Sequence, residues 1–280
     1  AALGCAPGVC RIQNFPDEEI QVSLDAEAAG RDVYLIQPLA PPAAGFLLES
    51  LLVADACRRR DAARITAVIP YLGYARQDRR VRGQEPVGAR VVADMLAARF
   101  DRVLALDLHN PSIEGFFTIP LRHVSAVPLL AAAARAAGLD DHVVVAPDLG
   151  AAKLAREYAA LLDLPVAFIH KERLGARNVR VTGITGQVAG RRPLLVDDMI
   201  STGGTLASAV RALLEAGARP PVTLAASHGL FVEPAAANLG ALPLDRVLVT
   251  DSLPTSGAGG LPLEIVEVGG LLAEAIQALR

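Results

Sequence analysis

Short apolar segments rich in β-branched residues alternate along the chain with longer stretches in which apolar residues recur every three or four positions. The first pattern predicts strands and the second predicts helices. The expected strands are 33–37, 65–69, 103–106, 143–146, 166–169, 194–196, 222–226, 246–250 and 264–267. The expected helices are 46–59, 87–99, 128–137, 151–162, 205–216 and 270–279. This alternation predicts an α/β protein, with each sheet mainly parallel and flanked by helices.

The order of these segments indicates two domains. Residues 120–128 end one run of strand and helix segments and open another, so we expect a boundary there, between 1–125 and 126–267. Two stretches, 71–86 and 170–185, are charged and polar and are predicted to be long loops. Long polar loops in a compact α/β protein are more often functional than accidental.

The amino-acid composition limits which cellular compartment and which partners the protein is expected to have. The chain has 280 residues, of which 52% are hydrophobic and 20% charged, as in a globular protein. A net charge of −3 gives no reason to expect nucleic acid or an anionic membrane as a partner. Charged residues, Pro or Gly interrupt each apolar run before the ~20 residues that a membrane span needs. Three cysteines without metal-ligand spacing suit a reducing, cytoplasmic compartment.

The strongest chemical signal follows the expected strand 194–196. Two adjacent acids, Asp197 and Asp198, come first, and a short loop then runs into a helix. That loop contains Ser201, Thr202, Gly203, Gly204 and Thr205. Backbone N–H groups at a helix N-terminus suit a phosphate, and carboxylates suit a sugar's vicinal hydroxyls or a bound metal. The plainer reading is an N-capped helix, but capping requires neither two acids nor two glycines.

A second signal follows the expected strand 65–69. The loop there opens with Arg76, Gln77 and Asp78 and continues with further arginines. Guanidinium groups are fork-shaped donors for polyphosphate, and an amide can read a purine edge. A basic surface loop without a ligand is the alternative.

Two more strand ends present candidate metal ligands. His109 follows the strand 103–106, and Asp148 follows the strand 143–146 just before a Gly and a helix. A neutral imidazole can bind a metal, although Mg²⁺ prefers oxygen, so the histidine would be one ligand among phosphates and waters. A structural histidine and a capping aspartate are the plainer readings.

The second long loop begins with Lys171 and Arg173. An ammonium and a guanidinium so spaced can stabilise charge on a transferring phosphoryl group. A solvated charged turn is the alternative. Only two of the 27 Lys and Arg residues are lysine, so a lysine at 171 favours a specific role.

These motifs resemble a known family. Segment 194–205 is similar to the phosphoribosyl-binding loop of the phosphoribosyltransferase superfamily. Segment 65–80 resembles the nucleotide-binding stretch of the ribose-phosphate pyrophosphokinases, which ordinary phosphoribosyltransferases lack. Near the amino end, Phe15, Asp17 and Glu19 resemble a loop that contacts the adenine of a nucleotide bound to the neighbouring subunit.

The resemblance implies two phosphoribosyltransferase-like domains. The first would bind ATP and would include a returning helix, 268–280; the second would bind ribose 5-phosphate. The reaction would be Mg²⁺-dependent transfer of pyrophosphate from ATP to the sugar's 1-hydroxyl, giving phosphoribosyl pyrophosphate and AMP. The shared nucleotide site implies a homo-oligomer, at least a dimer.

The same resemblance assigns roles to the residues quoted above. The sugar phosphate would contact Asp197, Asp198, Ser201, Thr202, Gly203, Gly204 and Thr205. The nucleotide would contact Phe15, Asp17, Glu19, Arg76, Gln77 and Asp78. The metal would contact His109 and Asp148, and the transferred group would contact Lys171 and Arg173.

Several positions depart from the family pattern. Glu18 and Ala151 stand where glycine is usual, and Ser201 stands where many relatives have aspartate. Ser201, together with segment 227–231, looks closer to the archaeal-type branch. The resemblance also implies that the chain begins after a first strand and most of a first helix. Two rivals stay open: a phosphoribosyltransferase that consumes the same product, and a non-catalytic, synthetase-associated regulatory subunit.

Overall fold

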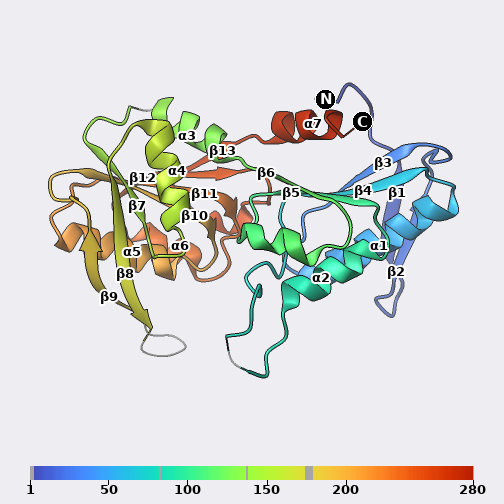
Figure 1. Cartoon of the computed structure of the whole chain (residues 1–280), viewed down its shortest axis with the longest axis horizontal. Helices are drawn as coiled ribbons and strands as arrows, with labels where there is room; N and C mark the ends of the chain where they lie inside the picture. The colour runs from blue at the N-terminus through green and yellow to red at the C-terminus, as the bar shows by residue number, and fades with distance from the viewer. Residues whose placement is uncertain (1–2, 82, 137, 174–178, 280) are drawn as a thin grey trace. The chain divides into compact units, whose positions relative to one another are not determined.

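The chain divides into two compact units in a computed structural model that describes residues 3–81, 83–136, 138–173 and 179–279. At 172, 173, 179 and 180 the description covers the backbone alone. Unit 1 comprises Ala1–Ser125 with Gly269–Arg280, and unit 2 comprises Ala126–Val268 (Figure 1).

Unit 1 is built on a parallel four-stranded sheet with the order β3-β4-β5-β6. These strands are β3 (Asp32–Ile36), β4 (Arg64–Ile69), β5 (Arg102–Leu106) and β6 (Leu121–Val124). The helices of this unit are α1 (Ala43–Arg59), α2 (Gly88–Ala97), the 3₁₀ segment η1 (Pro111–Phe116) and α7 (Gly269–Gln277). In Figure 1, α1 and α2 lie on one side of the sheet and α7 on the other. Because helices cover both faces, the middle strands β4 and β5 are buried along almost their whole length.

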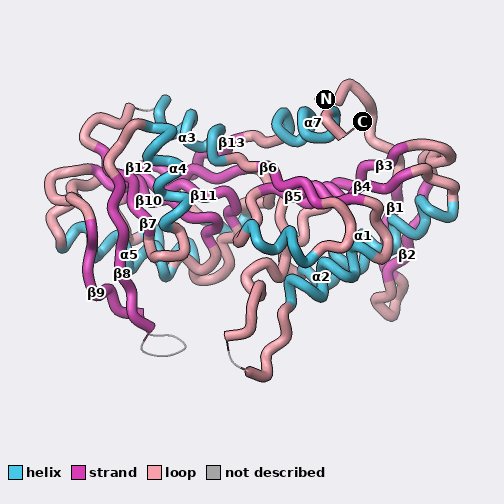
Figure 2. Tube along the Cα trace, in the orientation of Figure 1, coloured by secondary structure: helices cyan, strands magenta, loops and turns pink. Residues whose placement is uncertain are grey.

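A separate two-stranded antiparallel sheet completes unit 1. It pairs β1 (Cys10–Asn14) with β2 (Ile20–Leu24), and β2 packs against α1. Figure 2 shows this hairpin as two strands joined by a short turn. The turn therefore presents residues 15–19 at one end of the hairpin.

Unit 2 is built on a seven-stranded sheet with the order β13-β12-β11-β10-β7-β8-β9. Its strands are β7 (His142–Ala146), β8 (Val166–Arg173), β9 (Val179–Thr185), β10 (Arg192–Ile200), β11 (Val222–Gly229), β12 (Leu244–Thr250) and β13 (Leu263–Val266). All neighbours are parallel except β8 and β9, which form an antiparallel hairpin at one edge.

The strand order of unit 2 reverses between two central strands. From β7 the chain proceeds outward through β8 and β9, then returns to place β10 on the other side of β7. In open α/β sheets such a switch point opens a crevice at the carboxyl ends of the two strands, where ligands bind. The fold thus marks the ends of β7 and β10 as the place to look for a site.

Helices cover both faces of this sheet. The helices are α3 (Val127–Ala136), α4 (Ala152–Leu162), α5 (Gly204–Glu215), α6 (Ala235–Gly240) and the 3₁₀ segment η2 (Ser256–Ala258). The main core cluster joins α5 and α6 to inward-facing residues of β7, β10, β11 and β12. Helices α3 and α4 pack together and contact β7, β10, β11 and β12.

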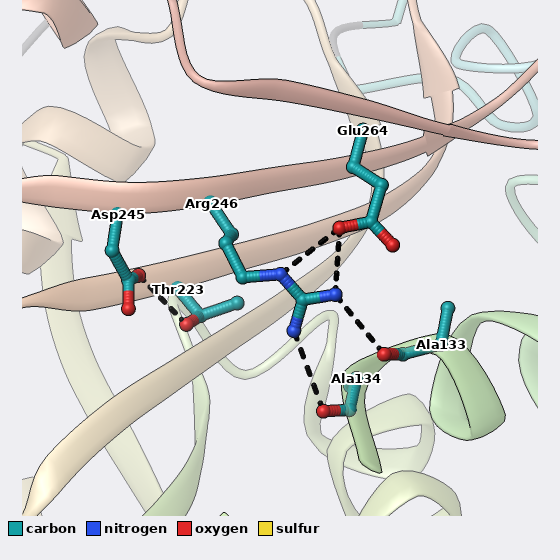
Figure 3. A network of polar contacts seen from close by, with 6 residues as sticks. All are labelled: Ala133, Ala134, Thr223, Asp245, Arg246 and Glu264. Carbon is teal, nitrogen blue, oxygen red and sulfur yellow. Dashed lines mark hydrogen bonds and ion pairs between the residues drawn. The ribbon is translucent and has the colours of Figure 1, made fainter. Parts of the chain in front are cut away.

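One arginine ties the edge of the unit-2 sheet to a helix end. Arg246 on β12 donates through Nε and Nη2 to Glu264 on β13, at 3.0 and 2.7 Å. Its Nη1 and Nη2 also donate to the carbonyl oxygens of Ala134 and Ala133, at 3.4 and 3.1 Å (Figure 3). A guanidinium therefore satisfies carbonyls at the carboxyl end of α3, where a positive charge is favoured.

Two expectations about local structure were wrong. The stretch 170–185, expected as a loop, contains the ends of the hairpin β8–β9, in which Val181 and Ile184 pack against the core. The strand expected at 194–196 extends over Arg192–Ile200, because its pairing with β11 continues to Ile200. Strand β6, the hairpin β1–β2 and helix α6 had no counterpart among the expected elements.

The longest described helix, α1, has 17 residues. In the part of the chain covered by the description, none of the helices combines the length and apolar character required to cross a bilayer.

Candidate active site

The adjacent acids Asp197 and Asp198 lie inside β10 at the switch point. The pairing of β10 with β7 ends at Leu195, whereas its pairing with β11 continues past them. Asp197 and Asp198 are therefore beyond the end of β7 although they remain in a regular strand. Both are half-buried. The sheet thus holds two carboxylates at the edge where its switch point lies.

The loop after β10 leads directly into α5. Gly203 has a φ of 73°, in the left-handed region, and α5 begins at the next residue. A Cβ on Gly203 would lie 2.8 Å from Cγ of Leu239. Both this close approach and the positive φ therefore exclude a side chain at this position. Thr202 and Thr205 are exposed. The first N–H groups of α5 lack partners within the helix, and this arrangement suits an anion such as phosphate.

Asp148 lies just past the end of β7, as expected. Its Oδ1 accepts hydrogen bonds from the backbone nitrogens of Gly150 and Ala151, at 2.9 and 3.3 Å. These bonds close the turn before α4, but Asp148 does not cap the helix itself, which begins at Ala152 without a side-chain cap. Ala151 is buried and does not prevent that turn.

Lys171 reaches the start of α5 from β8. Its Nζ donates to the carbonyl oxygen of Thr205, at 2.9 Å. Desolvation lowers the pKa of the Lys171 ammonium, and the negative charges of Asp148 and Asp197 oppose this effect. The side chain of Arg173 lies outside the described residues. Lys171, Asp148 and Asp197 thus lie close together beside the start of α5.

The electrostatics of this group favour a cationic or hydroxyl-bearing ligand. Burial raises the pKa of Asp197 well above its ordinary value, and the neighbouring charges of Asp198 and Asp148 raise it further. Three carboxylates that destabilise one another in this way are stabilised by a divalent cation or by hydroxyl donors.

These acids could supply only part of the ligand set of Mg²⁺. In the described ranges, no group of three or more His, Cys, Asp or Glu side chains is arranged to hold a metal by itself. Mg²⁺ commonly takes one or two carboxylates and completes its shell with waters and substrate phosphates. Asp148, with Asp197 nearby, fits that partial role.

In unit 1 the loop after β4 meets the loop after β5. Asp78 Oδ2 accepts a hydrogen bond of 2.7 Å from Nδ2 of Asn110. Arg76 and Gln77 are exposed, and the Gln77 side chain lies against Gly88 at the start of α2, where a Cβ would be 2.6 Å from its Oε1. Arg76, Gln77 and Asp78 are thus held beside the segment that contains His109.

His109 is exposed at the end of β5. The backbone turns sharply before it, since buried Asp107 has a φ of 35°. The nitrogen of Leu108 donates to Nε2 of His123, at 3.1 Å, and so fixes the turn to β6. A strained backbone held by neighbouring contacts is often found at functional sites.

The amino-terminal turn joins β1 and β2. Phe15 is 46% exposed, and the backbone nitrogen of Glu19 donates to Oδ1 of Asp17 at 3.3 Å. Glu18 has a φ of 71°, a conformation that glycine adopts without cost. The turn therefore keeps the glycine-like backbone, with some strain at Glu18. It belongs to a different sheet from the loops after β4 and β5.

Two side chains near these groups were not among the predicted site residues. Asn110 binds Asp78, and its position directly after His109 at a strand end was an available signal. Asn238 on α6 donates to the carbonyl oxygen of Thr202 at 2.8 Å. Because it lies 36 positions away from Thr202, no local pattern connects the two.

The fold and site define a class. An α/β unit with an acid pair and a phosphate-type loop at its switch point is a phosphoribosyltransferase domain, and a family model of that domain matches residues 126–231. A model of the N-terminal domain of ribose phosphate pyrophosphokinase matches residues 1–99. The chain belongs to the ribose-phosphate pyrophosphokinase family and is an enzyme of that class.

Individual relatives agree with this assignment over nearly the full chain. The ribose-phosphate pyrophosphokinase of Gloeobacter violaceus is 42% identical over 98% of this chain and 83% of its own length. That of Rhodopirellula baltica is 43% identical over 99% of this chain and 89% of its own length. The crystal structure of phosphoribosylpyrophosphate synthetase from Mycobacterium smegmatis superposes with a TM-score of 0.91, at 39% identity, over 99% of this chain and 92% of that one.

These relatives are bacterial, so the expected closeness to the archaeal-type branch is not supported. Ser201 and segment 227–231 alone were too small a sample of the chain to place it on a branch.

Proposed function

We propose that the protein transfers the pyrophosphoryl group of Mg-ATP to the 1-hydroxyl of ribose 5-phosphate, giving phosphoribosyl pyrophosphate and AMP. The observation that carries this assignment is the unit-2 site: Asp197 and Asp198 beside the left-handed Gly203 loop at a sheet switch point. Similarity to ribose-phosphate pyrophosphokinases over nearly the whole of this chain supplies the reaction class.

Unit 2 binds the sugar phosphate in this proposal. The N–H groups at the start of α5 and the hydroxyls of Ser201, Thr202 and Thr205 receive the 5-phosphate. Asp197 and Asp198 accept hydrogen bonds from the vicinal hydroxyls of the ribose. Both interactions use groups that the fold already directs to one edge of the sheet, so little reorganisation accompanies binding.

Unit 1 binds the nucleotide in this proposal. Arg76 contacts the polyphosphate, Gln77 contacts the base, and Asp78 holds the loop in place through Asn110. Phe15 offers an exposed ring for stacking on adenine, with Asp17 and Glu19 beside it as acceptors. That turn resembles a family loop that contacts a nucleotide bound to the neighbouring subunit, and this resemblance supports our proposal of a homo-oligomer of at least two chains.

Lys171 and Arg173 stabilise the transferred group. The sugar's 1-hydroxyl attacks the β-phosphorus in line and releases its proton to solvent. The bond from the β-phosphorus to the bridging α–β oxygen breaks, and AMP leaves with that oxygen. The protein contributes mainly positioning and charge, since such transition states need little covalent help. Mg²⁺, when bound, neutralises phosphate charge. His109 and Asp148 are its proposed protein ligands. We place the enzyme in the cytoplasm.

Product analysis tests the proposal. Incubation with Mg²⁺, ATP and ribose 5-phosphate, followed by phosphorus NMR, should show a pyrophosphate group attached to ribose and one AMP for each. ADP as the nucleotide product would indicate a simple kinase. Absence of turnover, with altered activity when the chain is added to an active synthetase, would instead indicate a regulatory subunit.

A further inference from the structure

Helix α6 packs against the loop 201–205, which joins β10 to α5. Asn238 Nδ2 donates to the carbonyl oxygen of Thr202, at 2.8 Å. The next residue, Leu239, is fully buried and contacts the Cα side of Gly203, where a Cβ would meet its Cγ at 2.8 Å. One short helix therefore touches two successive residues of the loop, once by a polar contact and once by packing.

The polar contact fixes the orientation of one peptide group. A trans peptide is planar, and its C=O and N–H point in opposite directions. Asn238 holds the carbonyl of Thr202 toward α6, so the N–H of Gly203 points away from α6. The N–H of Gly203 therefore stays available to an anion, as do the first N–H groups of α5, which lack partners within the helix.

This peptide precedes a glycine and therefore has two accessible orientations. In the alternative one, the Thr202 oxygen would replace the Gly203 N–H and would repel a phosphate. Glycine populates both signs of φ at similar cost, so the loop sequence alone does not exclude that state. Leu239 limits the space around Gly203 but makes no hydrogen bond that would select one orientation.

We infer that Asn238 is a positioning residue for the 5-phosphate: it selects the receptive orientation of the Thr202–Gly203 peptide before the sugar phosphate binds. The inference rests on the proposed function, because it requires a phosphate ligand in this loop. Apparent affinity falls in proportion to the fraction of protein in the receptive state.

The size of the effect follows from the environment of the bond. It is accessible to solvent, so its net strength is that of an ordinary neutral hydrogen bond. Loss of such a bond changes the loop equilibrium by ~3- to 10-fold. It raises the KM for ribose 5-phosphate by up to the same factor, which is reached when the unreceptive orientation is the more populated one.

Two variants and a control separate this role from a general structural one. Asn238→Leu keeps the branched shape and removes the donor, whereas Asn238→Gln keeps the donor. Ala237→Ser changes the exposed neighbour on the same helix. Asn238→Leu should raise the KM for ribose 5-phosphate by up to ~10-fold, with kcat and the KM for ATP unchanged. Asn238→Gln should restore part of the loss, and Ala237→Ser should match the parent.

An unchanged KM for ribose 5-phosphate in Asn238→Leu would overturn the inference, as would an equal rise in both KM values. Calorimetric titration of ribose 5-phosphate, with Mg²⁺ and a non-hydrolysable ATP analogue present, provides a readout independent of turnover. If the parent makes no AMP but binds the sugar phosphate more tightly than Asn238→Leu does, the positioning role stands and the proposed activity fails. If the parent binds no ribose 5-phosphate, the inference fails with it.

Discussion

At the scale of single residues, the unit-2 site is dominated by acids that lie close together, and their mutual repulsion destabilises the folded protein. Asp197 is half-buried beside Asp198 and near Asp148, and its raised pKa shows that its ionised form is unfavourable in the folded protein. Natural proteins retain such strain where a ligand relieves it. A ribose or a magnesium ion would supply that relief here.

This cost predicts a stability change with a definite pH dependence. The pKa of Asp197 is higher in the folded chain than the ordinary value of 3.8, so ionisation destabilises the fold at neutral pH. Asp197→Asn should therefore raise the melting temperature near pH 7.5 while it abolishes activity. The gain should shrink as the pH falls toward ~4, because the parent carboxyl then becomes protonated. A melting temperature lowered by Asp197→Asn at neutral pH would contradict the account.

Lys171 should matter for turnover more than for binding. Its ammonium is held at the start of α5 and is partly desolvated, so its charge acts strongly on a nearby phosphoryl group. We predict that Lys171→Ala lowers kcat about 10²-fold or more with a modest change in both KM values. Arg211→Ala, on the exposed side of α5, is the matched control. Unchanged turnover in Lys171→Ala would remove it from the mechanism.

At the scale of helices and strands, the spacing of apolar residues predicted the elements correctly wherever that spacing was regular. Each of the nine expected strands and six expected helices has a counterpart in the structure. Strand β10 extends further than its apolar run because its pairing with β11, a non-local property, continues through two acids. Strand β9 was hidden by Gly183 and polar neighbours, and α6 is too short for its period to be detected.

The site could be predicted in its parts but not in its contacts. The acid pair and the Gly203 loop are contiguous, so their joint role was visible in the sequence. The contact of Lys171 with Thr205 and that of Asp78 with Asn110 join residues 34 and 32 positions apart. Only the folded sheet brings those pairs together, and for the same reason Asn238 was missed.

The arginine of β12 provides a prediction at this scale. Arg246 is only 19% exposed and joins two strands to the end of α3. Arg246→Met should lower the free energy of unfolding by about 1–3 kcal/mol, because it removes charge-assisted hydrogen bonds and leaves the α3 carbonyls unsatisfied. Chemical denaturation measures this change, with Arg211→Met as the control. Equal stability of the two variants would show that the network in Figure 3 contributes little.

At the scale of the whole molecule, one chain combines two α/β units with different binding groups. Unit 2 presents acids and a phosphate-type loop, and unit 1 presents an arginine, an amide and a histidine at the ends of β4 and β5. This division suits a reaction with two phosphorylated substrates.

The most direct measurement of the central claim is the release of AMP from Mg-ATP with and without ribose 5-phosphate, for the parent and for an Asp197→Asn/Asp198→Asn double variant. The account predicts AMP from the parent only when the sugar phosphate is present, and none above background from the double variant. AMP release that ignores ribose 5-phosphate, or that survives loss of both acids, would contradict it.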